Sequence, residues 1–308
     1  MIRSQLADVE LVTDGLAFPE GPVAMSDGSV VLVEIDAGRL TRVMPDGSTD
    51  VVAELGGGPN GAAIGPDGAV YVCNNGGMRR DGRIQPGIQR VDLETGDSTW
   101  LYTESGGASF VGPNDLVFDT HGGFWFTDLG GGTVHYALAD GSAVSTVSRA
   151  VHPNGIGMSP AGDIVYWAQT TTRQVLRRRI SSPGVLEPWL GSDSMALVRK
   201  GAVDPFALLV GLPGAMELDS LAIDSSGAVC VGTLTDGGIT EIPADHSPAD
   251  VSDGIIHWGL PEHLYDGLVT NICFGGDDLT TAYITCSHTG RLVRCTWHRP
   301  GLALAHRA

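Results

Sequence analysis

The chain is poor in positive charge. Its 308 residues contain 18 Lys and Arg against 36 Asp and Glu, for a formal net charge of −18. Nucleic-acid phosphates are bound mainly through Lys and Arg, and anionic membrane surfaces attract basic segments. We therefore expect neither a nucleic acid nor a membrane as a partner. Most of the negative charge is interpreted as solvation of the surface, with attraction of a divalent cation as a smaller consequence.

Cysteine is also scarce, and long apolar runs are missing. The cysteines are Cys73, Cys230, Cys273, Cys286 and Cys295, and none forms a CxxC pair. An odd number argues against a complete disulfide framework, so we expect buried free thiols, with one disulfide between Cys286 and Cys295 left open. Residues 1–15 lack the apolar core of a signal peptide, and no run reaches transmembrane length. These features favour a cytoplasmic protein.

Glycine, in contrast, is abundant. The chain has 44 glycines, about twice the average usage, and many lie in turns such as PDG, SDG and HGG between short apolar strands. The strand patterns include VVLVEI, AVYVC, GFWFT, DIVYWA, AVCVG and TAYIT. No segment longer than one or two turns shows helical periodicity. The sequence therefore predicts an all-β protein.

Each of these strands ends a two-strand unit that begins with an acid or an amide. The six units start at positions roughly 50 residues apart, which is the repeat length of propeller blades. Third strands such as RLTRV and TVHYAL follow each unit, and weaker fourth strands such as DVVAEL and STWLY follow those. The residues that open the six units, here called the ring residues, are Glu20, Asn60, Asn114, Asn154, Asp219 and Asn271.

This organisation predicts a six-bladed β-propeller with four-stranded antiparallel blades around a central channel, in one domain over residues 1–308. The sixth blade lacks an outer strand near the C-terminus. The segment Asp8–Thr13 can supply it and remove an exposed edge, and residues 302–306 are the competing candidate. The fourth repeat carries an insertion at about 181–205, which either overhangs the pocket or elaborates the surface.

The repeat places the ring residues at one mouth of the channel. Asn and Asp often start strands merely because their side chains bond to nearby backbone, but six such residues in register are hard to explain that way. Carboxylate and amide oxygens are the ligands that Ca²⁺, Mg²⁺ and Mn²⁺ prefer. Glu20 and Asp219 would neutralise a divalent charge. The ring therefore predicts a site for a divalent ion, with Ca²⁺ favoured and Mn²⁺, Mg²⁺ or Zn²⁺ tolerated.

A second polar group lies where the second strand of each unit returns to the same mouth. We expect this group to surround the metal and contact substrate. Three histidines near strand ends, His135, His152 and His288, are candidate proton shuttles, although a structural role is favoured for each. The second group consists of Glu34, Asn74, Asn75, Asp128, Gln169 and Thr233.

Five motifs at the ring residues resemble those of the senescence-marker-protein, gluconolactonase and luciferin-regenerating-enzyme family. They are FPEGP, GPNDLVFD, HPNGIGMSP, ELDSLAID and TNICFGGDDLTTAYIT, and together they span nearly the whole chain. The resemblance implies a six-bladed propeller with one divalent metal held by Glu20, Asn114, Asn154 and Asp219. On that basis Asn60 and Asn271 are near neighbours of the metal and not direct ligands. We expect them to bind substrate, as we expect of Asn75, Asp128 and Gln169 from the second group.

Family members are typically lactonases, and related propellers hydrolyse organophosphates. Two positions depart from the family pattern: an Arg that contacts sugar lactones is Gly112 here, and the Gly that often follows the fifth-blade Asp is Ser220. These departures weaken the expectation that the substrate is a sugar lactone. They do not affect the expected metal site.

The leading hypothesis is a metal-dependent lactonase in which the metal polarises the lactone carbonyl for attack by water. Asp219 is the candidate base, or the group that holds the nucleophilic water. A phosphotriesterase-type hydrolase in the same pocket is the second hypothesis. A non-catalytic propeller with the metal as a structural pin is the third. We expect a small-molecule lactone as partner and a monomer or small homo-oligomer.

Overall fold

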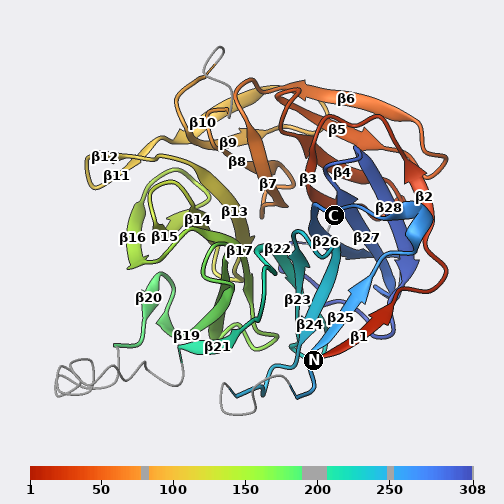
Figure 1. Cartoon of the computed structure of the whole chain (residues 1–308). Coiled ribbons are helices and arrows are strands. Elements are labelled where there is room, and N and C mark those ends of the chain that lie inside the picture. The colour runs from red at the N-terminus through yellow and green to blue at the C-terminus, as the bar shows by residue number, and fades with distance from the viewer. Residues whose placement is uncertain (78–82, 189–206, 248–252, 307–308) are drawn as a thin grey trace.

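The structure is a computed structural model that describes residues 1–77, 83–188, 207–247 and 253–306. These residues form strands and turns, with a single 3₁₀ turn, η3 (Glu262–Leu264). Six antiparallel sheets are arranged around a central axis, each with one strand next to the axis (Figure 1). This confirms the predicted six-bladed β-propeller.

The first three blades follow the predicted order from the inner to the outer strand. Blade 1 consists of β3 (Pro19–Ala24), β4 (Val30–Glu34), β5 (Arg39–Val43) and β6 (Thr49–Glu54). Blade 2 consists of β7 (Pro59–Ile64), β8 (Val70–Asn74), β9 (Gly87–Val91) and β10 (Ser98–Tyr102). Blade 3 consists of β13 (Pro113–Phe118), β14 (Gly123–Asp128), β15 (Thr133–Leu138) and β16 (Val144–Arg149). A small hairpin precedes blade 3 and is formed by β11 (Glu104–Ser105) and β12 (Ala108–Ser109).

The remaining blades carry additions to this plan. Blade 4 consists of β17 (Pro153–Met158), β18 (Ile164–Gln169), β19 (Gln174–Ser182) and β21 (Leu208–Gly211), with β20 (Val185–Leu186) paired to the end of β19. Blade 5 consists of β22 (Leu218–Ile223), β23 (Val229–Thr233), β24 (Gly238–Ile242) and β25 (Ile256–Gly259). Blade 6 begins with β26 (Val269–Gly275), β27 (Thr281–Cys286) and β28 (Arg291–Thr296).

The N-terminus closes the propeller. Strand β2 (Glu10–Thr13) pairs antiparallel with β28 and is the outer strand of blade 6, as predicted for the first candidate segment. The competing prediction for residues 302–306 is wrong, because this segment leaves blade 6 and Leu302 bonds instead to Ile223 of blade 5. Strand β1 (Ile2–Gln5), which was not predicted, adds to β25 in parallel. Both pairings protect a sheet edge.

The insertion of the fourth repeat is only partly described. Its first residues continue β19 and turn back into β20. Residues 189–206 lie outside the described residues, and so does the expectation that the insertion overhangs the pocket.

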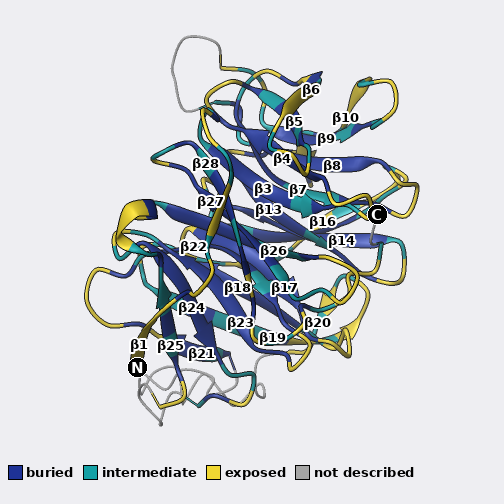
Figure 2. Ribbon diagram, turned by 90° about the vertical axis from the view of Figure 1, so that its right-hand side faces the viewer, coloured by how far each residue is buried: buried dark blue, intermediate teal, exposed yellow. Residues whose placement is uncertain are grey.

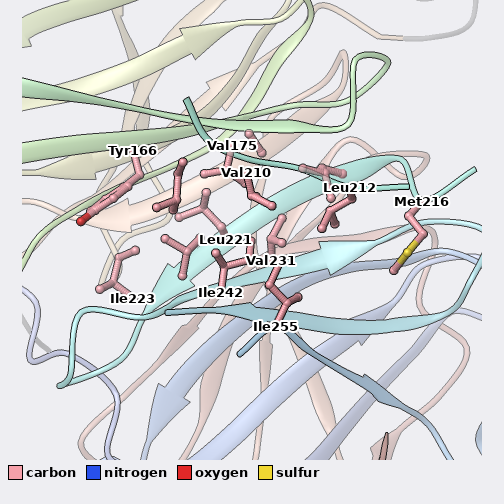
Figure 3. Close-up of a cluster of buried hydrophobic side chains, with 14 residues drawn as sticks. Tyr166, Val175, Val210, Leu212, Met216, Leu221, Ile223, Val231, Ile242 and Ile255 are labelled. Carbon is pink, nitrogen blue, oxygen red and sulfur yellow. The ribbon is translucent and has the colours of Figure 1, made fainter. Parts of the chain in front are cut away.

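The core lies between the blades and not in one central mass. In one cluster, Tyr166 and Val175 of blade 4 pack against Leu221, Val231 and Ile242 of blade 5 (Figure 3). Buried positions follow the strands near the axis, while exposed ones gather on loops and outer strands (Figure 2). Each fully buried Leu, Ile or Val side chain contributes about 1.5–3 kcal/mol. These interfaces therefore hold the blades rigidly around the channel.

All five cysteines are free thiols. Within the last hairpin, Cys286 lies opposite Arg291 and Cys295 lies opposite Ala282, so the two cysteines are not cross-strand neighbours. The disulfide that the sequence left open is therefore not formed.

Candidate functional site

The inner strands bring the six ring residues to one register. Each ring residue is the second or third residue of its strand, and adjacent inner strands contact one another all the way around the axis. Glu20, Asn114 and Asn154 are buried, whereas Asp219 is only partly buried. The inner strands are β3, β7, β13, β17, β22 and β26 (Figure 1).

Glycines after the ring residues allow the inner strands to approach closely. A Cβ at Gly61 would lie 2.6 Å from the backbone oxygen of Asn114, and a Cβ at Gly155 would lie 2.5 Å from the backbone nitrogen of Leu221. Contacts this short are sterically forbidden, so a larger residue would push the blades apart. The EG and NG pairs of the sequence thus set the width of the ring.

Two buried oxygens of the ring have no hydrogen-bond partner. Glu20 Oε2 accepts from the backbone N–H of Gly21 at 2.7 Å and from Asn271 Nδ2 at 2.9 Å, while Glu20 Oε1 has no partner. Asn114 Oδ1 is likewise buried and unpartnered. Buried polar atoms are nearly always satisfied, so two orphaned oxygens in one ring fit a cation that accepts both lone pairs.

The electrostatics of the ring point the same way. Burial raises the pKa of Asp219 well above its usual range, and the nearby Glu20 carboxylate raises it further. Burial also raises the pKa of Glu20. Two neighbouring carboxylates without a counter-charge, one buried and one partly buried, repel each other, and a divalent cation between them would remove this penalty. Within the described residues, no three His, Cys, Asp or Glu side chains form a metal-binding group, so such a site must use the amides too.

The structure adds one acid that the sequence analysis missed. Asp115 follows Asn114 and is buried, and burial together with Glu20 raises its pKa to about 7. Its Oδ1 accepts the N–H of Leu116 at 2.8 Å, and its Oδ2 accepts the N–H of Ile156 in the next blade. The signal was present, because three of the equivalent positions are Gly and this one alone is an acid.

Most of the second polar group clamps the loops that lead into the inner strands. The Asp128 carboxylate accepts from the N–H groups of Val111 at 2.9 Å and Gly112 at 2.7 Å, and also from Gly131 at 2.8 Å. Gln169 Oε1 accepts from the N–H of Val151 at 2.8 Å. These bonds lie just before Asn114 and Asn154, so the side chains fix the backbone that presents the ring.

Two further members repeat this arrangement in the first two blades. Glu34 Oε2 accepts from the N–H of Ala17 at 2.7 Å and also pairs with Arg39. Asn74 Oδ1 accepts from the N–H of Gly58 at 3.0 Å.

The other two members differ from the clamps. Asn75 is half-buried at the mouth between blades 2 and 3, with its Cβ 3.9 Å from the position a Cβ would take at Gly112. Thr233 is fully buried and bonds to the hydroxyl of Thr240.

The candidate histidines have distinct surroundings. His135 is buried inside blade 3, stacked on Phe126 and bonded to the hydroxyls of Thr133 and Thr146, and burial lowers its pKa to about 4. This supports the structural role favoured for it. His152 is exposed at the mouth, two residues before Asn154, and its Nδ1 lies 2.9 Å from the Thr171 hydroxyl.

The channel continues on the far side of the ring. There a cavity of about 280 Å³ is lined mainly by apolar residues such as Val117, Met158 and Ile223, and Asp115 lies on its wall. The C-terminal segment covers part of this end, where the ring of His306 packs edge-on against Phe118. Asn271 of the ring also lines the cavity, so the cavity reaches the ring from the side opposite the clamped loops.

The fold and this site define a six-bladed propeller with an oxygen-lined centre at one channel mouth. The family model described as the SMP-30/Gluconolactonase/LRE-like region matches residues 18–288. The chain belongs to this family, which confirms the resemblance seen in its motifs.

Two curated relatives extend over most of the chain. It is 24% identical over 320 residues to a gluconolactonase of Zymomonas mobilis, an alignment that covers 93% of this chain and 81% of the relative. It is 26% identical over 273 residues to a pentonolactonase of Haloferax volcanii, with 86% and 80% covered.

Solved structures share the fold. A calcium-binding protein, regucalcin, of Agrobacterium tumefaciens matches with a TM-score of 0.72 at 15% identity, covering 99% of this chain and 100% of that one. A gluconolactonase of Xanthomonas campestris matches with a TM-score of 0.72 at 20% identity, covering 94% and 90%. Among the described residues, no helix has the length and apolarity needed to span a membrane.

Proposed function

We propose that the protein is a divalent-metal-dependent lactone hydrolase with its reaction centre at the ring. The observation that carries this proposal is the pair of orphaned buried oxygens, Glu20 Oε1 and Asn114 Oδ1, in a ring that also contains Asp219. Membership in a family whose curated relatives include a gluconolactonase and a pentonolactonase supports the reaction class.

The residues proposed to hold the metal are Glu20, Asn114, Asn154 and Asp219. When bound, a divalent ion would act as a Lewis acid toward the lactone carbonyl oxygen. Calcium is the favoured ion, because all the donors are hard oxygens and regucalcin, a structural relative, is a calcium-binding protein. The same set tolerates Mn²⁺, Mg²⁺ or Zn²⁺.

The chain's own residues have separate tasks in this proposal. Asn271 holds Glu20 through its 2.9 Å hydrogen bond, and the Thr170 hydroxyl accepts from Asn154 Nδ2 at 3.2 Å and so orients the amide oxygen of Asn154. Asp219, the more open of the two acids, holds the attacking water and accepts its proton. The water oxygen adds to the carbonyl carbon, the ring C–O bond breaks, and the ring oxygen takes up a proton to give a hydroxy acid.

The substrate is proposed to lie between the ring and the mouth. Asn60, Asn75 and Asn271 are the proposed amide contacts, and contact by Asp128 and Gln169 stays a prediction beside their observed role as clamps. We also propose that the protein is cytoplasmic and that residues 1–308 form one domain. We expect a monomer or a small homo-oligomer.

A substrate panel tests the reaction class. Metal-loaded protein is assayed for proton release from sugar, aliphatic and aromatic lactones, and in parallel for hydrolysis of organophosphates. Hydrolysis of any lactone supports the proposal. Organophosphate hydrolysis alone would favour the phosphotriesterase hypothesis, and a folded, metal-loaded protein inactive on both would favour the binding propeller.

The variant Asp219→Asn tests the role of the acid. We expect a loss of at least about 100-fold in kcat at saturating metal, since general-base catalysis typically contributes that much. Metal content is measured in the same samples. A variant that binds metal and retains full turnover would refute the role of Asp219 as base.

A further inference from the structure

Six loops surround the mouth of the channel above the ring, and their residues decide what the site can hold. The residue three positions before each ring residue is apolar in every blade. This set, here called the collar, consists of Ala17, Gly57, Val111, Val151, Met216 and Leu268. Charged or hydroxyl-bearing side chains are thus missing from the collar in all six repeats.

Two collar side chains face solvent instead of the core. Val111 is 53% exposed and Val151 is 50% exposed. Asp128 and Gln169 each accept a hydrogen bond from the backbone N–H of one of these valines and hold its loop in this conformation. Single exposed apolar residues are ordinary on a protein surface, but equivalent ones in adjacent blades beside a candidate site are candidates for contact with a ligand.

An exposed aromatic ring lies in another loop that leads into an inner strand, between blades 5 and 6. Tyr265 is 53% exposed, and its hydroxyl donates to the carbonyl of Thr235 at 3.1 Å. The Thr235 hydroxyl in turn donates to the carbonyl of Ala215, in the loop that leads to Asp219. The hydroxyl of Tyr265 is therefore occupied, and its ring face is the part left for a ligand.

In blades 1 and 4, a proline directly precedes the ring residue, and the residue before that proline has a strained backbone. Phe18 has φ of 59° and His152 has φ of 44°, a region that non-glycine residues rarely adopt. They occupy equivalent positions in blades 1 and 4, which face each other across a six-bladed ring. Their carbonyls are held by the N–H groups of Ile35 and Thr170. Strain of this kind clusters at ligand sites, and Phe18, which is half-buried, is the aromatic member of the pair.

A site for sugar lactones needs polar side chains around the substrate, in contrast to the apolar collar. Each of their hydroxyl groups loses hydrogen bonds to water on binding and must regain them from the protein. At the mouth, Gly112 offers no side chain, although a Cβ there would meet nothing closer than 3.4 Å. At the described collar positions, the exposed side chains of Val111 and Val151 offer no such donors. The amides proposed to contact substrate, Asn60, Asn75 and Asn271, lie in the ring or closer to it, where the ester group would be.

We propose that the site takes a lactone with an apolar body, either an alkyl-substituted or a benzo-fused ring, in preference to a sugar lactone. This inference rests on the proposed lactonase function and names its substrate class. The apolar part of the substrate lies against Phe18, Val111, Val151 and Tyr265, while the ester group faces the ring.

The test compares six-membered lactones that carry an alkyl chain, a fused benzene ring or sugar hydroxyl groups. The pair with alcohol leaving groups, δ-decanolactone and glucono-δ-lactone, gives the direct comparison. Metal-loaded protein is assayed with δ-decanolactone, dihydrocoumarin and glucono-δ-lactone. We expect kcat/KM to be at least about 100-fold higher for the first two, on the scale by which pockets discriminate apolar groups. A higher kcat/KM for glucono-δ-lactone would overturn the inference and leave the lactonase function standing. Failure on all three lactones would instead count against the lactonase function.

Variants locate the effect in the collar. Val111→Asn and Val151→Asn are expected to lower the ratio of kcat/KM for δ-decanolactone to that for unsubstituted δ-valerolactone by about 10-fold. The matched control is Val51→Asn on the outer strand β6, where the side chain is 48% exposed and distant from the mouth. An unchanged ratio in both collar variants, or an equal change in the control, would overturn the proposed contact.

Discussion

Asn271 Nδ2 donates a 2.9 Å hydrogen bond to Glu20 Oε2, which joins residues 251 positions apart in the chain. The bond closes the ring between blade 6 and blade 1. It also orients the carboxylate, because it engages one oxygen and leaves Oε1 buried and unpartnered. The two residues therefore form one unit, in which the amide holds the acid ready for a cation.

The variant Glu20→Gln tests two effects of this buried charge, which are destabilisation of the metal-free fold and binding of calcium. Burial penalises the charged carboxylate, so the metal-free variant is expected to melt higher than the metal-free parent, by about 2–4 °C for each kcal/mol relieved. Calcium affinity is expected to fall at least about 100-fold, more than for loss of an outer partner. Thermal melts and calorimetric titration measure the two effects.

The control for this variant is Glu94→Gln, which changes an exposed acid in a turn of blade 2. It is expected to leave both quantities unchanged. A Glu20→Gln protein that binds calcium as tightly as the parent would remove Glu20 from the proposed ligand set.

The stability of the metal-free protein is expected to fall as pH rises. Asp115 has its pKa raised from 3.8 to about 7 in the folded chain, so between these values the unfolded chain has lost a proton that the folded chain keeps. Folding therefore becomes less favourable as pH increases through this window, by roughly 4 kcal/mol in total at about 1.4 kcal/mol per pKa unit. Above about pH 7 this contribution no longer changes.

Thermal melts in EDTA from pH 5 to pH 8 measure this dependence, and Asp115→Asn is expected to flatten it. Added calcium should raise the melting temperature more at pH 8 than at pH 5, because its ligands must be deprotonated. The same slope in Asp115→Asn as in the parent would show that another group is responsible.

Asp128→Asn tests the clamp on the third-blade loop. The substitution replaces one accepting oxygen by a donor that faces backbone N–H groups, which costs about 1–3 kcal/mol. The loop carries Asn114, so calcium affinity is expected to fall about 10-fold as well. Asp140→Asn, in an exposed turn with Ser142, is the matched control and should leave calcium affinity unchanged. Equal affinities for all three proteins would contradict a positioning role for Asp128.

The thiols are expected to be unreactive in the folded protein. Burial raises the pKa of Cys273 and Cys286 to about 12, and only the thiolate attacks a disulfide reagent. Ellman's reagent at pH 8 should therefore react slowly with native protein and with five thiols per chain after denaturation in guanidinium. Free glutathione provides the reference rate. A count of three after denaturation would reveal a disulfide.

The repeat made the fold and the ring predictable from the sequence. Glu20 and Asp219 stand at the same place relative to a two-strand unit, and equivalent places in a propeller meet at the axis. The closing strand β2 was predictable for the same reason, because blade 6 lacked a partner. Strand β1 was missed because its four residues are all exposed and carry no alternating pattern.

The repeat did not allow the hydrogen-bond partners of individual side chains to be predicted. Asp128 was expected to lie around the metal and contact substrate, and its bonds to Val111 and Gly112 depend on how two loops fold back on each other. Asp115 differs from the glycines that follow three other ring residues, but the repeat alone does not show that it is buried beside another acid. Its importance comes from burial near Glu20, which lies in a different blade.

The central claim is that one divalent ion in the ring switches on lactone hydrolysis. The most direct measurement titrates calcium into EDTA-stripped protein while proton release from δ-decanolactone is recorded in weak buffer, with circular dichroism run alongside. The account predicts that the rate rises with bound calcium and saturates at one ion per chain, without a change in secondary structure. Hydrolysis at full rate in the stripped, folded protein would contradict the account.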